Sequence, residues 1–213
     1  MLQILWNQLA YQGVLFVSNI TEHKHIVLVN TLSLFIPVFT LFNLLTLISF
    51  GIPPIFLYGS IIYMFLLPIS IVLNSNGKLL TARLYLFLLS LAYIFLISLL
   101  QGNQTRGHLF FLAEALVVYF VFPSYQRKLV HILVGILLIL FSGFSFYHDH
   151  LVPLLILPPE KIKIAGLITD IAFAIILIGF SYYIHNTFQK TELYVQLEHE
   201  KSEKLLQNKF TLF

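Results

Sequence analysis

The sequence predicts an all-α membrane protein: a six-transmembrane-helix bundle with an N-terminal interfacial helix and a C-terminal cytoplasmic signalling helix. Three observations predict this class. The chain of 213 residues is 59% hydrophobic and only 10% charged, with a mean hydropathy of +0.91, whereas soluble domains carry about 25% charged residues. Its apolar residues gather in six runs, each close to the ~20 residues that a helix needs to cross a bilayer. Its basic residues fall on alternate sides of these runs.

Residues 1–25 precede the apolar runs and have a pattern of their own. No Lys or Arg comes before their apolar positions, as it would in a signal peptide. Polar residues recur at helical spacing, and Trp6 and Tyr11 can anchor the opposite face. The pattern predicts a helix that lies in the membrane interface. A short uncleaved span and a segment without fixed structure are the alternatives.

We predict six transmembrane helices, connected mostly by short loops rich in turn-forming residues, so that neighbouring helices pack antiparallel. Pro37 and Pro68 lie inside the first two and predict kinks. Three prolines interrupt residues 148–163, which favours an external lid or interfacial loop over a seventh span. The six predicted helices cover 26–50, 54–73, 79–100, 108–122, 129–147 and 164–184.

The distribution of the 12 basic residues predicts the orientation. Three lie on one side of the membrane, namely Arg106, Lys161 and Lys163. The other nine lie on the opposite side, which the positive-inside rule makes the cytoplasm, together with both termini. Anionic lipid of the inner leaflet accounts for these charges, so nucleic acid is not an expected partner. The nine are Lys24, Lys78, Arg83, Arg127, Lys128, Lys190, Lys201, Lys204 and Lys209.

Residues 186–213 are charged and consist largely of helix formers, which predicts a continuous cytoplasmic helix after the membrane domain of residues 26–185. Glu200 and Lys204 form an i,i+4 pair. A thin stripe of Leu193, Leu197 and Leu205 suits a short parallel dimer, so a homodimer is expected. A solvated tail without a partner is the alternative. The absence of cysteine excludes disulfides and thiolate chemistry.

Residues 198–208 resemble the coupling helix that joins multi-span membrane domains to class III adenylate or guanylate cyclases in bacteria. In the membrane part, Gly102-Asn103, residues 107–112, and Phe122 with Arg127 are similar to the six-span sensor regions of those cyclases and of quorum-sensing receptor kinases. The resemblance implies a sensor in a bacterial inner membrane that signals to a cyclase-type output domain. The tail residues that would couple the two are Glu200, Ser202, Glu203, Leu205 and Leu206.

The cyclases of that family continue after the coupling helix into a catalytic domain with two metal-binding aspartates. This chain reads Lys209 to Phe213 instead. We therefore expect no enzyme activity from the chain itself. It is expected to be either a shortened product or a sensor that works with separately encoded partners.

Ionisable residues inside the spans predict the ligand site, because each costs on the order of 3 kcal/mol at the bilayer centre unless it finds a partner. Glu114 and Asp170 lie at a similar depth below the outer surface. They predict a site for a cationic or hydrogen-bonding small molecule, with acids that only hold helices together as the alternative. Three further hydrogen-bonding side chains reach a similar level, and a histidine stands at the mouth: Tyr93, Ser142, Ser145 and His108.

Two histidines raise the less favoured alternative of a b-type haem. His131 and His185 lie near the cytoplasmic side of the fifth and sixth spans and could be axial ligands. Helix-end hydrogen bonding explains both equally well. The sequence shows no committed spacing for a metal site, so no cofactor is expected.

We therefore predict a sensory module that binds a small ligand and transmits a conformational signal through its C-terminal helix. The alternatives are a small transporter or channel whose acids carry protons or cations, and a haem-containing membrane sensor. Transport assays and a visible absorption spectrum distinguish these classes.

Overall fold

The computed structural model of the chain describes residues 8–14, 20–52, 54, 57–101, 105–147, 158–182 and 186. Residues Met1–Asp170 form one compact unit and residues Ile171–Phe213 form a second. The predicted signalling helix, its coupling residues and His185 lie outside the described residues, apart from residue 186. Most of the proline-rich segment 148–163 lies outside them too.

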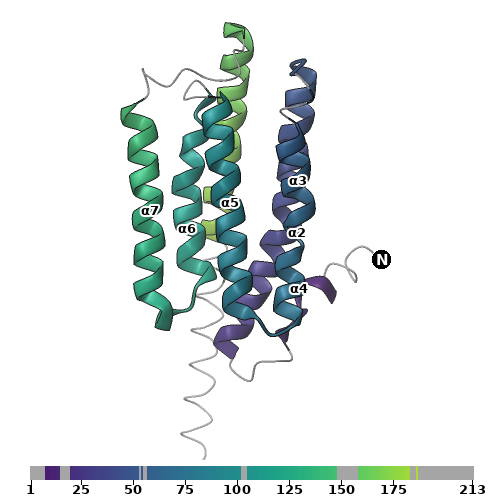
Figure 1. The fold of residues 1–213 in the computed structure, drawn as a ribbon, viewed down its shortest axis with the longest axis vertical. Coiled ribbons are helices and arrows are strands. Elements are labelled where there is room, and N and C mark those ends of the chain that lie inside the picture. Colours follow the sequence, from purple (N-terminus) through teal and green to yellow (C-terminus); the bar gives the residue numbers. More distant parts are fainter. Residues whose placement is uncertain are drawn as a thin grey trace, which may run out of the picture. The chain divides into compact units, whose positions relative to one another are not determined.

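The described elements of the first unit are helices (Figure 1). Short 3-10 turns, η4 (Gly107–Leu109) and η5 (Ser124–Gln126), lead into the last two of its labelled helices. These α-helices are α2 (Ile20–Ser49), α3 (Tyr58–Leu66), α4 (Ile69–Ser75), α5 (Leu79–Gln101), α6 (Phe110–Val121) and α7 (Arg127–Phe146).

Among the described residues, five helical segments are long and apolar enough to cross a membrane. The predicted fourth span, 108–122, corresponds to a shorter apolar helix over Gly107–Val121. The described part of the chain is therefore all-helical with five candidate spans, and the sixth crossing stays a prediction. The five are Glu22–Ser49, Tyr58–Ser75, Leu79–Gln101, Ser124–Phe146 and Pro159–Tyr182.

The two prolines inside the spans act differently. Helix α2 continues through Pro37, whereas Leu67 and Pro68 separate α3 from α4. Both of these residues keep right-handed helical backbone angles. Ser70 N–H donates to Leu67 O, and the Leu66 carbonyl accepts from the Tyr85 hydroxyl at 3.1 Å. A neighbouring helix thus supplies the missing donor, as expected of a proline kink in a membrane helix.

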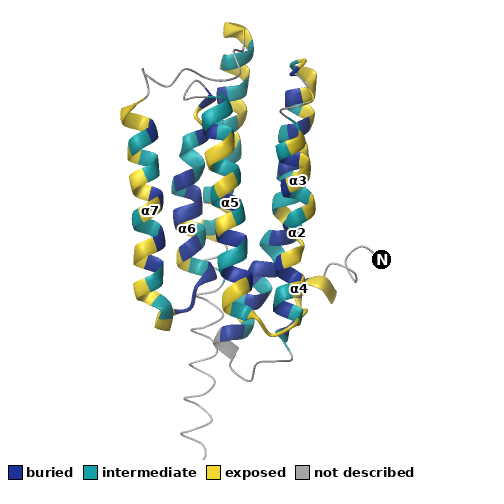
Figure 2. Ribbon diagram, viewed as in Figure 1, coloured by how far each residue is buried: buried dark blue, intermediate teal, exposed yellow. Residues whose placement is uncertain are grey.

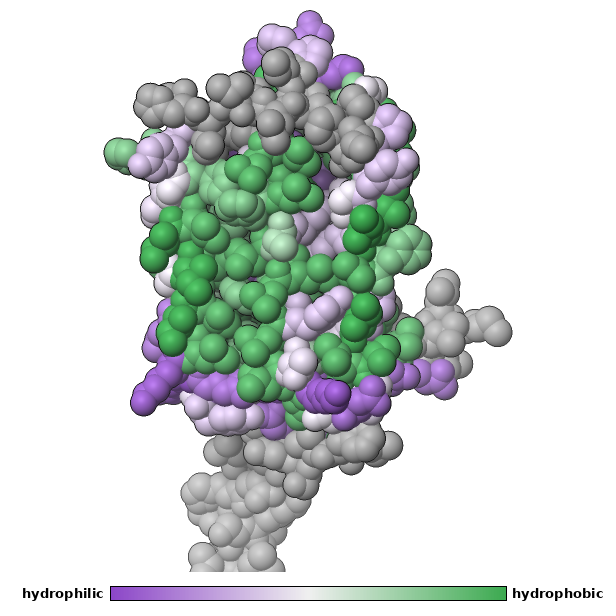
Figure 3. All heavy atoms as spheres, viewed as in Figure 1, coloured by the Kyte–Doolittle hydropathy of each residue, from purple (hydrophilic) through white to green (hydrophobic). Residues whose placement is uncertain are grey.

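Helix α6 is packed on three sides, because it contacts α2, α5 and α7. Figure 2 shows it as one of the most deeply buried helices. Helix α7 instead buries one stripe and exposes large apolar residues on its other face, such as Ile132 and Ile139. Figure 3 shows a broad apolar surface of this kind above a hydrophilic band at the lower end. Such a surface suits lipid rather than water.

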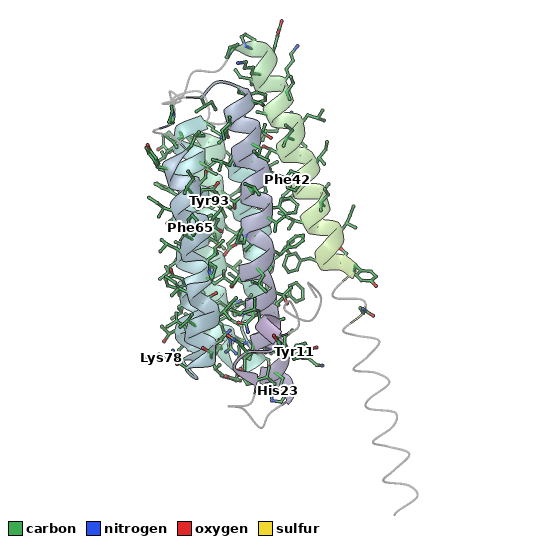
Figure 4. The ribbon with its side chains drawn as sticks, turned by 90° about the vertical axis from the view of Figure 1, so that its right-hand side faces the viewer. Tyr11, His23, Phe42, Phe65, Lys78 and Tyr93 are labelled. Atoms are coloured by element: carbon green, nitrogen blue, oxygen red, sulfur yellow. The ribbon has the colours of Figure 1, made fainter. Side chains whose placement is uncertain are left out.

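The basic residues at one end of the first unit differ in their exposure. Lys24, Lys78, Arg127 and Lys128 are exposed, and Figure 4 shows Lys78 with Tyr11 and His23 at the lower end. The sequence predicts Arg83 among the basic residues of this end, yet its side chain lies inside the bundle and is 1% exposed. It is therefore a buried residue of α5 rather than part of a solvated basic cluster.

Candidate functional site

The candidate site lies among α2, α3, α5 and α6, where a set of buried or partly buried polar side chains interrupts the apolar interior. Its centre is a pair of tyrosines, Tyr63 of α3 and Tyr93 of α5, whose rings stack at 4.0 Å with an angle of 7°. Figure 4 shows Tyr93 between the two ends of the bundle. We call the set the polar seam; its members are Asn43, Ser60, Tyr63, Ser90, Tyr93 and Glu114.

Hydrogen bonds join the tyrosines crosswise to the opposite helices. The Tyr63 hydroxyl lies 3.1 Å from Ser90 Oγ, and the Tyr93 hydroxyl lies 3.0 Å from Ser60 Oγ. Tyr93 also hydrogen-bonds the side chain of Asn43 on α2. Each tyrosine thus places its apolar ring in the interior while its hydroxyl finds a partner on another helix.

Glu114 of α6 has the fewest partners among the members of the polar seam. It is 7% exposed, and its carboxyl lies within electrostatic range of the Tyr63 hydroxyl. Among the described residues no hydrogen bond or ion pair to this carboxyl is formed. Buried carboxyls normally have such partners, because removal from water is costly for either protonation state.

A small hollow of about 10 Å³ adjoins the polar seam. That volume is close to what a single water molecule needs. Gly59 borders the hollow, and a Cβ at this position would lie 2.9 Å from Leu96 Cδ2, so glycine allows α3 to approach α5. The lining residues are Leu47, Ile52, Gly59, Ser60, Tyr93, Leu96, Ile97, Leu100 and Gln101.

The other residues predicted for the ligand site lie elsewhere. Asp170 forms an ion pair with Arg106, at 2.6 Å, with side chains 38% and 60% exposed. Ser142 and Ser145 are exposed on α7. The ring of His108 lies 5.7 Å from that of Phe141. The structure therefore brings Tyr93 and Glu114 together through Tyr63, and it gives Asp170 a different partner.

The residues considered for haem or metal binding are not assembled. His131 is exposed, with its ring 6.4 Å from that of Tyr119, and His185 lies outside the described residues. Within the described ranges, no group of three or more His, Asp or Glu side chains could hold a metal ion. The haem interpretation stays a prediction that no contact supports.

Sequence reasoning missed a second polar cluster, at the end of the bundle that the basic residues predict to be cytoplasmic. We call it the inner-end cluster: Glu22, Arg83 and Tyr125. The Glu22 carboxylate accepts hydrogen bonds from Arg83 Nη2 and from the Tyr125 hydroxyl. Close by, His25 Nδ1 donates to Phe120 O at 2.8 Å. These contacts join the starts of α2 and α5 to the end of α6 and the α6–α7 connection. One feature of the sequence could have predicted this cluster: Arg83 lies inside the third apolar run, only four residues from its start.

A pair of asparagines holds residues 8–14 against the same end of the bundle. Asn30 Nδ2 lies 2.9 to 3.3 Å from the carbonyl oxygens of Leu9, Ala10 and Gln12. Asn74 Nδ2 donates to Asn30 Oδ1 at 2.7 Å. Gly13 has φ +87°, and a Cβ there would lie 2.5 Å from Asn74 O. Only glycine fits at this contact.

Comparison with protein-family models, with curated proteins and with solved structures finds no match to this chain.

Proposed function

We propose that the chain is a membrane-embedded receptor that binds a small ligand at the polar seam and signals through its C-terminal segment. The observation that carries the proposal is the buried carboxyl of Glu114, to which no described residue forms a hydrogen bond or ion pair. An acid that only holds helices together would hydrogen-bond a neighbouring helix. An acid without such a bond is better explained by a partner that comes from outside the chain.

The chemistry of the polar seam favours a small organic cation with hydrogen-bonding groups. The Glu114 carboxylate would neutralise the positive charge, and the faces of Tyr63 and Tyr93 attract cations. Hydroxyls of Ser60 and Ser90 can bind the remaining polar groups of the ligand. The aromatic stack must open to expose these surfaces.

The size of the hollow suggests how binding would produce a signal. A space for about one water cannot hold such a ligand, so binding requires that α3 and α5, which line the hollow, move apart. A ligand that binds only the opened packing shifts the population toward that packing. In the proposed arrangement six helices cross a bacterial inner membrane with both termini in the cytoplasm. The tail of a homodimer then passes the change to a cyclase-type output domain, as the resemblance of residues 198–208 suggests.

The experiment fuses the chain to a cyclase catalytic domain and screens small organic cations for a change in cyclic-nucleotide production. We expect Glu114→Gln to abolish the response while expression in the membrane is retained. Glu160→Gln, at an exposed position, is the matched control. A Glu114→Gln fusion that responds like the parent contradicts the assignment of the ligand to the polar seam.

The same carboxyl supports one rival, a transporter in which Glu114 carries a proton or cation. The two functions differ in their output. A transporter is favoured if the purified protein moves protons or cations across liposomes and if Glu114→Gln abolishes this flux. In that case the chain should also fail to regulate the fused cyclase.

A further inference from the structure

The inner-end cluster holds a second feature that the receptor proposal does not use. Arg83 is 1% exposed and donates from Nη2 to Glu22, but its other terminal nitrogen, Nη1, is buried without a hydrogen-bond partner in the described part of the chain. A guanidinium has five N–H donors and is always charged. A buried N–H of this kind without an acceptor costs about 1–3 kcal/mol or more.

The connection between α6 and α7 carries an acceptor atom that lacks a donor among the described residues. Gln126 Oε1 is a buried acceptor without a donor among the described residues, and it follows Tyr125 directly. The Tyr125 hydroxyl binds Glu22 and also hydrogen-bonds the Arg83 side chain, whereas the residue is 71% exposed. Arg83 therefore lacks one acceptor and Gln126 lacks one donor among the described residues. Tyr125 links the two residues, because it binds the same carboxylate as Arg83 and adjoins Gln126 in the sequence.

The position of the inner-end cluster indicates which molecule supplies the missing acceptor and the missing donor. Arg83 lies four residues after the start of α5, which corresponds to about 6 Å along the helix. Exposed basic residues, Lys78, Arg127 and Lys128, lie at the same end. Such a belt attracts anionic headgroups of the cytoplasmic leaflet. Arginine binds phosphate oxygens through paired N–H groups.

We propose that the inner-end cluster is a binding site for the headgroup of an anionic phospholipid of the phosphatidylglycerol type. A phosphate oxygen accepts from Arg83 Nη1, and a glycerol hydroxyl donates to Gln126 Oε1. The Tyr125 side chain swings outward to admit the headgroup, while Arg83 Nη2 keeps its ion pair with Glu22. The bound lipid then joins α2, α5 and the α6–α7 connection more tightly.

The experiment measures thermal unfolding of the full chain in three kinds of nanodisc. One contains phosphatidylcholine alone, one contains phosphatidylcholine with phosphatidylglycerol, and one contains phosphatidylcholine with inorganic phosphate added to the buffer. We expect phosphatidylglycerol to raise the unfolding midpoint by several degrees, because a ligand that binds only the folded state stabilises it. Stabilisation by inorganic phosphate alone to the same extent overturns the lipid as the source of the phosphate.

The matched variants are Arg83→Lys and Arg127→Lys. Lysine at position 83 keeps a positive charge for Glu22 but lacks the second N–H branch of the guanidinium. We expect Arg83→Lys to lose the midpoint shift and Arg127→Lys, at an exposed position, to keep it. Equal shifts in both variants overturn the proposal, since they indicate general attraction to the basic end.

Native mass spectrometry of the wild-type protein provides a test that does not depend on how the variants fold. We expect phosphatidylglycerol to stay bound when the protein is released from mixed-lipid nanodiscs, in preference to phosphatidylcholine. Release of the protein without retained lipid overturns the proposal and leaves a buried water as the partner of Arg83 Nη1.

Discussion

Two buried glutamates, Glu22 and Glu114, have the same exposed fraction of 7% but opposite surroundings. Glu22 is bound on both carboxylate oxygens, by Arg83 and by Tyr125. Glu114 lies on α6 without a hydrogen bond among the described residues. The difference separates two roles, because a fully paired buried charge contributes to structure whereas an unpaired one requires an outside partner or a change of protonation.

The strongest test of this distinction is Glu22→Ala. The substitution leaves the Arg83 guanidinium buried without its counter-charge, so we expect a loss of about 3–5 kcal/mol in the free energy of unfolding. The measurement is unfolding of the purified protein in detergent by a denaturing detergent. The control is Glu160→Ala, which removes an exposed carboxylate. Equal midpoints for the two variants contradict a structural role for Glu22.

The asparagine pair offers a neutral counterpart to the inner-end cluster. Asn74→Ala removes the donor to Asn30 Oδ1 and loosens the support of residues 8–14. We expect a loss of about 1–2 kcal/mol and faster proteolysis near residues 8–14. Asn76→Ala at an exposed position is the control. Unchanged proteolysis in Asn74→Ala shows that the docking does not depend on this contact.

Within the polar seam, Tyr63→Phe removes the hydroxyl that binds Ser90 and keeps the ring that stacks on Tyr93. We expect a loss of about 1 kcal/mol, measured in the same unfolding assay. The control is Tyr58→Phe, whose side chain is 56% exposed. A larger loss than in Glu22→Ala would mean that the polar seam, rather than the inner-end cluster, dominates stability.

The ion pair between Asp170 and Arg106 is half-exposed, and its contribution should be smaller. We expect Asp170→Asn to change the free energy of unfolding by less than about 1 kcal/mol, because solvent screens exposed pairs. A double-mutant cycle with Arg106→Gln measures the coupling. A coupling as large as that of the buried pair Glu22 and Arg83 contradicts the solvent-exposed arrangement.

The smallest effect on stability is expected from Glu114→Gln. The amide is nearly isosteric and avoids the burial of a charge, so the unfolding midpoint should stay the same or rise. The ligand response of the fused cyclase should nevertheless disappear. Strong destabilisation by Glu114→Gln would place Glu114 with Glu22 among structural acids and remove the basis of the receptor proposal.

The sequence predicts the helices well where an apolar run has clear ends. Helix α5 (Leu79–Gln101) agrees with the predicted span 79–100 within one residue, because Asn76-Gly77 and Gly102-Asn103 bound the run. The predicted span 54–73 corresponds to the candidate span Tyr58–Ser75, and its ends are less accurate. Leu67 and Pro68 divide it into α3 and α4, at the position of the predicted kink. Hydropathy counts apolar side chains, whereas proline changes the backbone hydrogen bonding.

Of the polar residues predicted for the interior site, Glu114 is buried and Tyr93 partly buried, whereas Asp170, Ser142 and Ser145 are partly or fully exposed. The sequence does not predict their partners. Depth along a helix follows from residue number, so Glu114 and Asp170 were expected at one level. Rotation about the helix axis decides which side chains meet, and hydropathy contains little information about it when a helix is apolar on all sides. Tyr63 and Ser90 were missed because tyrosine and serine occur throughout membrane helices without a functional role.

The brevity of α6 also bears on how the protein is assembled. Its 12 residues extend about 18 Å, less than the ~30 Å hydrocarbon layer, and they include an acid. Such a segment inserts poorly on its own, since acidic side chains oppose partition from the translocon into lipid. In the proposed six-span arrangement we expect α6 to enter the bilayer together with α5 and α7, so that its insertion would depend on cooperation between successive hairpins during synthesis.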